Sequence, residues 1–248
     1  MRTGLVSVTF RSQDRRGVVD LARDAGLSEI EWGGDIHVPH GDIRAAEDAK
    51  SLCRNAGIVC GSYGSYYKLP VTGEGFDDVL NTAAALGASS IRIWAGTRGS
   101  RDTDAAARNA MTDVLRRNAD AAAARGMELS FEYHGGTLTD NADSAIRLLC
   151  DCGRENVRLH WQPNQFEDVD YNLRALRRVA EYVDIIHVFA WEGDKWFPLA
   201  KHEDAWRRYF DVLFELGKPR SALLEFLPCE CRDDLLRDAD TLNGWVGK

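Results

Sequence analysis

The chain repeats one pattern of hydrophobic and polar positions along its 248 residues. A short apolar run, rich in β-branched and aromatic residues, ends in polar residues and is followed by a stretch of alanine, leucine and charged residues. Such runs predict buried strands, and the longer stretches between them predict helices. The eight predicted strands are Leu5–Phe10, Glu29–Trp32, Ile58–Tyr63, Ser90–Trp94, Leu129–His134, Val157–Gln162, Ile185–Ala190 and Ala222–Leu227.

The segments between these runs carry helical signals. Between Asp104 and Arg125, the apolar residues Ala107, Met111 and Val114 recur at a spacing that places them on one helix face. Glycines stand between several helical stretches and the next strand, where a left-handed C-cap is expected. These glycines are Gly26, Gly57, Gly87, Gly126 and Gly217.

Eight strand–helix units of about 31 residues each predict a single (β/α)8 TIM barrel. A doubly wound open sheet is the structural alternative, and it would require a glycine-rich phosphate turn after the first strand. Phe10 is followed instead by the charged sequence RSQDRRG. Because no linker or change of composition divides the chain, we expect one domain over residues 1–248.

Composition and charge argue against some classes of binding partner. The chain carries 31 lysines and arginines against 39 acidic residues, a net charge of −8. This excess of acid argues against binding to nucleic acid or to an anionic membrane surface. No apolar stretch reaches the ~18 residues of a membrane-spanning helix, and the N-terminus does not resemble a signal peptide. With six cysteines, which we interpret as reduced thiols, we expect a cytoplasmic protein.

Candidate chemistry lies at the carboxyl ends of the predicted strands, where TIM barrels place their active sites. The first four predicted strands offer Glu31, Ser62, Arg92 and other polar residues, but the last four give the stronger indication of a site. Glu132, His187 and Glu225 each stand within apolar β sequence, and Gln162 ends the strand between the first two. A carboxylate is costly to bury unless it is paired, protonated or bound to metal. The set therefore predicts a site for a divalent metal, and its oxygen-rich donors suit Mn²⁺, with Mg²⁺ or Co²⁺ as alternatives.

With these residues in place, the sequence resembles the xylose isomerase-like TIM barrel family, especially its ketose 3-epimerase branch. The resemblance implies one divalent metal held by Glu132 in FEYH, His187 in IIHVF and Glu225 in LLEF. The sixth strand departs from the family pattern, which has an Asp ligand and a substrate-facing His three residues later. Gln162 and Gln165 occupy these positions in HWQPNQ, so Gln162 would ligate the metal through a neutral amide oxygen.

Several further residues are candidates for binding substrate. Tyr63 and Trp94 lie at strand ends, where aromatic rings could line a polyol site. His134 follows Glu132 by two residues and shares its side of the strand if the strand continues. Gln165 occupies the position of the family's substrate-facing His, and Lys195 belongs to the long segment after the seventh strand.

The predicted function is a metal-dependent isomerase or epimerase acting on a sugar, polyol or keto-sugar. It would work through an enediolate, with Glu132 and Glu225 as acid and base on opposite faces of the substrate. A dehydratase or lyase on the same scaffold and a non-catalytic sugar-binding barrel are the alternatives, and the sequence leaves the oligomeric state open. Six histidines and a pI near 5.3 argue against an endonuclease IV-like hydrolase.

Overall fold

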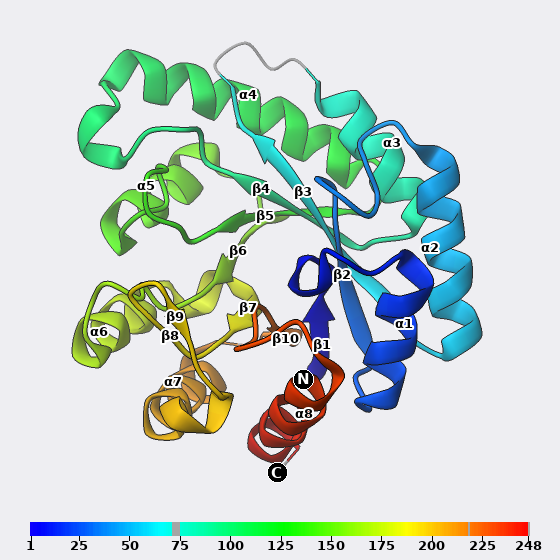
Figure 1. Ribbon diagram of the computed structural model, residues 1–248. Helices are drawn as coiled ribbons and strands as arrows, with labels where there is room; N and C mark the ends of the chain where they lie inside the picture. The colour runs from blue at the N-terminus through cyan, green and yellow to red at the C-terminus, as the bar shows by residue number, and fades with distance from the viewer. Residues whose placement is uncertain (71–74, 218, 248) are drawn as a thin grey trace.

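Eight parallel strands close into a barrel in the computed structural model, which describes residues 1–70, 75–217 and 219–247. Around the barrel the strands follow the order β1-β10-β7-β6-β5-β4-β3-β2, so neighbours in the chain are neighbours in the sheet. Figure 1 shows these strands at the centre of a ring of helices, which confirms the predicted (β/α)8 barrel. The barrel strands are β1 (Arg2–Val6), β2 (Glu29–Gly33), β3 (Val59–Lys68), β4 (Ser90–Trp94), β5 (Glu128–Glu132), β6 (Val157–Trp161), β7 (Val183–Val188) and β10 (Ser221–Leu224).

Each barrel strand is followed by an α-helix. The helices are α1 (Arg15–Asp24), α2 (Ile43–Ala56), α3 (Phe76–Leu86), α4 (Ala105–Ala123), α5 (Ala142–Cys152), α6 (Val169–Val179), α7 (Glu203–Leu216) and α8 (Arg232–Val246). Side chains cap several N-termini; Asp104, for example, accepts a hydrogen bond from the backbone of Ala107 at the start of α4, a contact that stabilises a helix by about 1 kcal/mol. Among the described residues, no helix is both long and apolar enough to cross a membrane.

Most predicted strands differ from the observed ones by a few residues at their ends, and the largest differences are in the first and the third strand. The first strand ends at Val6, because Ser7–Phe10 turn into a short 3-10 helix rather than continuing the sheet. The third strand is longer than predicted: it extends to Lys68, and its pairing with β4 shifts between Gly64 and Tyr67. Within this irregular part Tyr66 adopts a positive φ of 56°. Both differences lie at the carboxyl ends of strands, the end that carries the candidate chemistry.

The predicted glycine caps are confirmed at four positions and wrong at one. Gly26, Gly57, Gly87 and Gly126 have φ between 67° and 77°, the left-handed region that glycine enters at little cost. Gly217 instead has an extended φ of −110°. It is required for space, since a Cβ there would lie 2.7 Å from the carbonyl oxygen of Ala180.

The apolar core is divided by the sheet. Its larger part packs the helices against the outer faces of the strands and contains the fully buried Trp32, Trp161 and Trp206. A smaller cluster of Val6, Val8, Ile185 and Leu223 belongs to β1, β7, β10 and the turn after β1. Toward the carboxyl ends of the strands, the side chains that β2, β4, β5 and β6 place in the barrel interior are polar. Layers of branched apolar residues usually fill such barrels.

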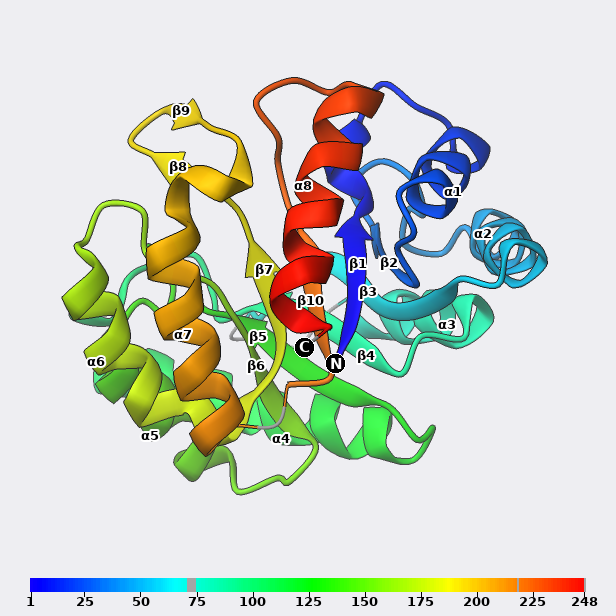
Figure 2. The same ribbon diagram turned by 90° about the horizontal axis from the view of Figure 1, so that it is seen from below.

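A small hairpin and the chain ends complete the architecture. Strands β8 (Trp191–Glu192) and β9 (Lys195–Trp196) pair antiparallel between β7 and α7. In Figure 2 the hairpin lies at the end of the barrel toward which the arrow of β1 points, which is the carboxyl end of the strands. The first strand and the last helix, α8, lie side by side in both views.

Candidate metal centre

Three of the predicted metal ligands meet at the carboxyl end of the barrel. Glu132 is the last residue of β5, His187 lies in β7, and Glu225 directly follows β10. One donor atom from each lies within 4.8 Å of a donor atom from each of the others, and all three side chains are buried. Because alternate residues of a strand face the barrel interior, the neighbouring strands β7 and β10 and the nearby strand β5 bring these donors together.

Gln162 joins this group from the end of β6. Its Nε2 lies 3.3 Å from Glu132 Oε1, and its Oε1 lies 3.3 Å from His187 Nδ1. The same Nδ1 lies 3.2 Å from Glu225 Oε2. Two carboxylates, one imidazole and one amide therefore surround a single small space. This donor set fits a hard divalent cation such as Mn²⁺, Mg²⁺ or Co²⁺.

A buried arginine, Arg92, connects the candidate ligands to a carboxylate on another strand, Glu31 of β2. Arg92 of β4 donates through Nη1 to Glu132 Oε2 and through Nε to Glu31 Oε1, the latter at 2.7 Å. The indole nitrogen of Trp94 also donates to Glu132 Oε2, at 2.6 Å. One oxygen of Glu132 is thus engaged by two donors, and Oε1 faces Gln162. The guanidinium of Arg92 also lies over the ring of Tyr66, 4.8 Å from its centroid.

Glu31, on β2, collects four polar groups beneath the candidate ligands. It accepts hydrogen bonds from the Ser62 hydroxyl and from Arg92, and its Oε2 lies 2.9 Å from Nε2 of His160. Its Oε1 lies 3.4 Å from Nε2 of His187. Glu31 is completely buried, so these contacts replace the water that would otherwise solvate its carboxylate.

The charges in this cluster shift the pKa values of its members. Burial raises the pKa of Glu132, but the positive charges of Arg92 and His187 outweigh this effect and leave the pKa below its ordinary value. Burial likewise opposes ionisation of Glu31, but Arg92, His187 and His160 together outweigh it, so the pKa of Glu31 lies well below the ordinary range. Burial lowers the pKa of His187, yet Glu225 and Glu31 raise it to about 10. The imidazole of His187 therefore carries the positive charge that a bound divalent ion would otherwise supply to these carboxylates.

Three of the predicted substrate residues, Trp94, His134 and Gln165, lie beside the centre. Trp94 and His134 stack with ring centroids 4.7 Å apart. A pocket of about 200 Å³ is lined by His134, Gln162 and Gln165, together with neighbouring residues of the loops after β5 and β6. The stacked rings and the amide of Gln165 thus border the same side of the centre as Gln162.

The structure does not bring the other two predicted substrate residues to this space. Tyr63 faces away from the barrel interior: its side chain is completely buried, and its hydroxyl donates to the backbone carbonyl of Val38 at 2.7 Å. The neighbouring Ser62, rather than Tyr63, points inward to Glu31 because successive strand residues face opposite sides. Lys195 is exposed in the β8–β9 hairpin, paired in register with Glu192.

The backbone at Glu225 is held by an unusual turn. Phe226 has a φ of 61°, a left-handed conformation that is costly for a bulky residue. Its backbone N–H donates to the hydroxyl of Thr9, and its ring stacks on Trp196 of the hairpin with a centroid distance of 5.6 Å. These contacts hold the turn that directs Glu225 toward the barrel axis. The hairpin thereby forms an aromatic rim beside the centre.

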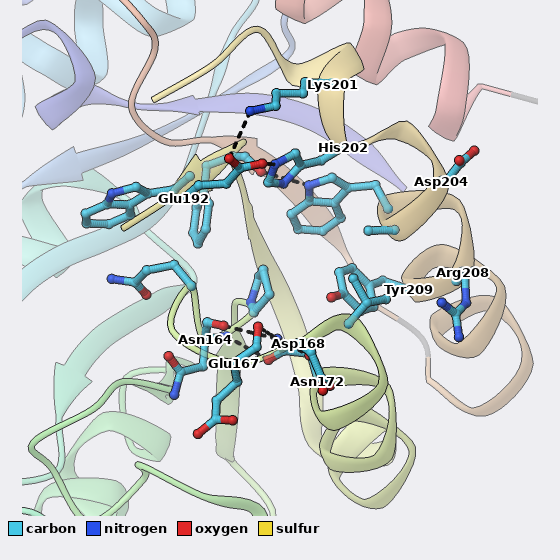
Figure 3. A pocket seen from close by; sticks show the side chains of 17 residues that line it. Asn164, Glu167, Asp168, Asn172, Glu192, Lys201, His202, Asp204, Arg208 and Tyr209 are labelled. Atoms are coloured by element: carbon cyan, nitrogen blue, oxygen red, sulfur yellow. Dashed lines mark hydrogen bonds and ion pairs between the residues drawn. The ribbon is translucent and has the colours of Figure 1, made fainter. Parts of the chain in front are cut away.

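A larger pocket of about 470 Å³ lies outside the barrel interior. It is bordered by the loop after β6, by the segment after β7 and by α7. Figure 3 shows Glu192 reaching Lys201 and His202 on one side, and Asn164 bound to Asn172 on the other. None of Glu132, His187 and Glu225 lines this pocket. It shares residues 163–165 as a wall with the smaller pocket.

The sequence pattern indicated Glu31 and Arg92 as polar strand residues, and His160 begins the segment HWQPNQ, but none of the three was assigned a place in the predicted site. The structure joins all three to the candidate ligands. A signal was present, since each stands in an apolar strand in the same way as Glu132 and His187. An arginine inside a barrel strand predicts acidic partners on other strands, because a lone buried charge is not tolerated.

The sequence matches the family model described as xylose isomerase-like TIM barrel over residues 19–219. Comparison with curated proteins finds none that matches.

Several solved structures share the fold. The probable 3-DHS dehydratase AsbF from Bacillus anthracis has a TM-score of 0.80 at 17% identity, with 98% of this chain and 99% of that chain covered. The D-allulose 3-epimerase from Methylomonas sp. has a TM-score of 0.77 at 14% identity, covering 99% and 98%. A xylose isomerase-like TIM barrel protein from Mycobacterium smegmatis, in complex with magnesium, has a TM-score of 0.76 at 14% identity, covering 99% and 96%. At these identities the likeness concerns the fold alone.

Proposed function

Because the chain belongs to the xylose isomerase-like TIM barrel family, we propose that it is a divalent-metal-dependent isomerase or epimerase of a sugar, polyol or keto-sugar. The observation that carries the proposal is the convergence of Glu132, His187 and Glu225, with Gln162 beside them. These residues would hold the metal, Mn²⁺ before Mg²⁺ or Co²⁺. When bound, the ion would polarise the substrate carbonyl and acidify the neighbouring carbon-bound proton.

The two glutamates would move that proton. Glu132 and Glu225 lie on β5 and directly after β10, and donor oxygens of the two lie within 4.8 Å of each other. One carboxylate would abstract the proton from the substrate carbon to give an enediolate, and the other would return a proton to the opposite face. Each needs an oxygen within about 3 Å of the proton that it transfers. Oε1 is the oxygen of Glu132 that neither Arg92 nor Trp94 engages.

The stacked pair of Trp94 and His134, together with Gln165, would bind the substrate. Their aromatic faces suit the C–H face of a sugar ring or chain, and the Gln165 amide can hydrogen-bond to a hydroxyl group. The adjoining pocket of about 200 Å³ fits a small molecule rather than a polymer. A small sugar-like substrate is therefore the partner that this space favours.

A dehydratase is the second candidate, and the asymmetry between the two glutamates favours it. Arg92 and Trp94 both hold Oε2 of Glu132, and its pKa lies below the ordinary value, which weakens Glu132 as a base. Elimination of water requires one base, for which Glu225 would serve, to abstract the proton from carbon, and the neighbouring hydroxyl to leave as water with the proton that Glu225 then returns. Similarity of fold to a probable dehydratase is in keeping with this alternative.

A proton-exchange screen with metal analysis tests the proposal. The purified protein would be analysed for bound metal, then incubated with ketoses, inososes and keto-sugars in D₂O with Mn²⁺ or a chelator. Metal-dependent deuterium incorporation with an epimeric or isomeric product would support the proposed activity, and loss of water would support the dehydratase. Bound sugar without exchange or conversion would indicate the non-catalytic barrel and overturn the proposal.

A further inference from the structure

A completely buried glutamate, Glu31, lies against one candidate metal ligand, His187, and is linked to a second, Glu132, through Arg92. It lies on β2, and its carboxylate receives Ser62 Oγ and Arg92 Nε and approaches the rings of His160 and His187. It belongs to none of the ligand positions named above. A buried carboxylate with so many partners needs an explanation beyond packing, because an apolar residue would fill the same space at a smaller desolvation cost.

His187 presents its two ring nitrogens to different groups. Nδ1 faces Glu225 at 3.2 Å and the Gln162 amide oxygen at 3.3 Å, on the side of the candidate ligands. Nε2 faces Glu31 at 3.4 Å and is buried without a hydrogen bond among the described residues. A histidine that ligates through Nδ1 must carry its proton on Nε2, and an acceptor near Nε2 fixes that arrangement. Glu31 occupies the acceptor position.

The same carboxylate acts on Glu132 through Arg92. The Arg92 Nε lies 2.7 Å from Glu31 Oε1, while its Nη1 binds Glu132 Oε2. A planar guanidinium whose edge is held by one carboxylate presents its remaining donors in a fixed direction. The orientation of Glu132 on β5 therefore depends on Glu31 on β2.

We infer that Glu31 is a positioning residue of the metal centre, which orients His187 through its Nε2 and Glu132 through Arg92. This inference rests on the proposed metal dependence. Glu31 itself would touch neither ion nor substrate. The competing explanation is that Glu31 only neutralises Arg92 and contributes stability.

Glu31→Gln tests the inference, and Glu29→Gln is its matched control. Glu29 is also completely buried on β2, but it lies one layer below, where it accepts from Ser221 Oγ at 2.7 Å and contacts Arg2. We expect Glu31→Gln to weaken Mn²⁺ binding, measured by calorimetry, by about 10- to 100-fold, as for other partners of ligating histidines. Glu29→Gln should leave Mn²⁺ affinity within a factor of two or so of the unaltered protein. Unchanged affinity in folded Glu31→Gln, or an equal loss in both variants, would overturn the inference.

A second variant and a structural measurement test the inference if Glu31→Gln does not fold or if no metal binds. Should Glu31→Gln fail to fold, Glu31→Asp keeps the charge beside Arg92 but withdraws the carboxylate by one methylene, and weakened Mn²⁺ binding is again expected. Crystal structures of the metal-free variants provide a readout that needs no metal: the His187 ring and the Glu132 carboxylate should turn away from their positions in the unaltered protein. If the unaltered protein binds none of Mn²⁺, Mg²⁺ and Co²⁺, the proposed function fails, and the crystal structures still decide the role of Glu31. Unmoved side chains there would reject that role.

Discussion

Arg92 and Glu132 form an ion pair between adjacent strands in which the arginine is 1% and the glutamate 4% exposed. The pair joins a candidate acid–base residue to a fixed positive charge, which also reaches Glu31. Buried pairs of this kind contribute little net stability, but breaking one is costly because the remaining charge is left without a partner. The pair therefore allows a direct test of how the barrel interior is held together.

Replacing Arg92 with Met should lower the free energy of unfolding by about 3–5 kcal/mol, since Glu31 and Glu132 would both lose their guanidinium partner. Denaturant unfolding monitored by circular dichroism measures the change. Arg108→Met is the control, because Arg108 is also buried but its Nη2 binds the neutral Ser144 hydroxyl at 2.8 Å. We expect a loss of about 1–3 kcal/mol there. Equal losses in both variants would show that the two carboxylates do not depend on Arg92.

Removal of metal should destabilise the protein if Glu132, Gln162, His187 and Glu225 bind an ion. An ion present at a hundredfold excess over its Kd stabilises the folded state by about 2.7 kcal/mol. The melting temperature should therefore fall on addition of a chelator and recover when Mn²⁺ is restored. Identical melting in both conditions, with no metal found by elemental analysis, would contradict a metal centre.

Gln162→Asp should tighten Mn²⁺ binding, because a hard cation gains a charged ligand where it had a neutral amide. The expected change is a lower Kd by calorimetry, with lower stability of the metal-free form, where a further carboxylate faces Glu132. Gln165→Glu adds the same charge to the adjoining pocket and should tighten binding less. An equal or weaker affinity in Gln162→Asp would place residue 162 outside the metal coordination.

Glu132→Gln and Glu225→Gln should each retain the fold and lose most turnover, since an amide cannot act as a general base. General acid–base catalysis contributes about 10²–10⁴-fold, and losses of this order in kcat are expected on any substrate found by the exchange screen. An epimerase should suffer in both variants, whereas a dehydratase that uses Glu225 as its base should suffer more in Glu225→Gln. A variant with unchanged kcat would exclude its glutamate as acid or base, and a rate lost only together with the metal would make it a ligand alone.

The fold could be predicted from the sequence because its signal is repeated. Each strand–helix unit shows the same alternation of apolar runs and charged helical stretches, so an error in one unit does not alter the count. The errors lie where local geometry is decided by distant contacts. Ser7–Phe10 continue the apolar alternation of the first strand yet turn away from the sheet, and Gly217 ends α7 without the left-handed conformation, its lack of a side chain being explained by the nearby carbonyl of Ala180.

The candidate site could be predicted from the sequence only in part. Carboxylates and a histidine in late strands could be selected because their burial is costly, and the structure brings Glu132, His187 and Glu225 together. Tyr63 was misplaced because the direction of a side chain depends on strand register, and the pairing of β2 with β3 shifts between Ile30 and Glu31. The link from Glu31 through Arg92 to Glu132 spans three strands. No local spacing encodes it.

The polar side chains in the barrel interior limit which amino-acid replacements this chain can accept during evolution. Glu31, Arg92, Glu132 and His187 each neutralise or orient another member, so a single replacement leaves a charge stranded away from water. Accepted replacements should therefore occur in pairs. A related chain that lacks arginine at the position of Arg92 should also lack an acidic residue at the position of Glu31 or Glu132. The polar residues of the barrel interior would then change together or not at all. The aromatic rim formed by the β8–β9 hairpin would vary independently of them, according to the substrate that enters the site.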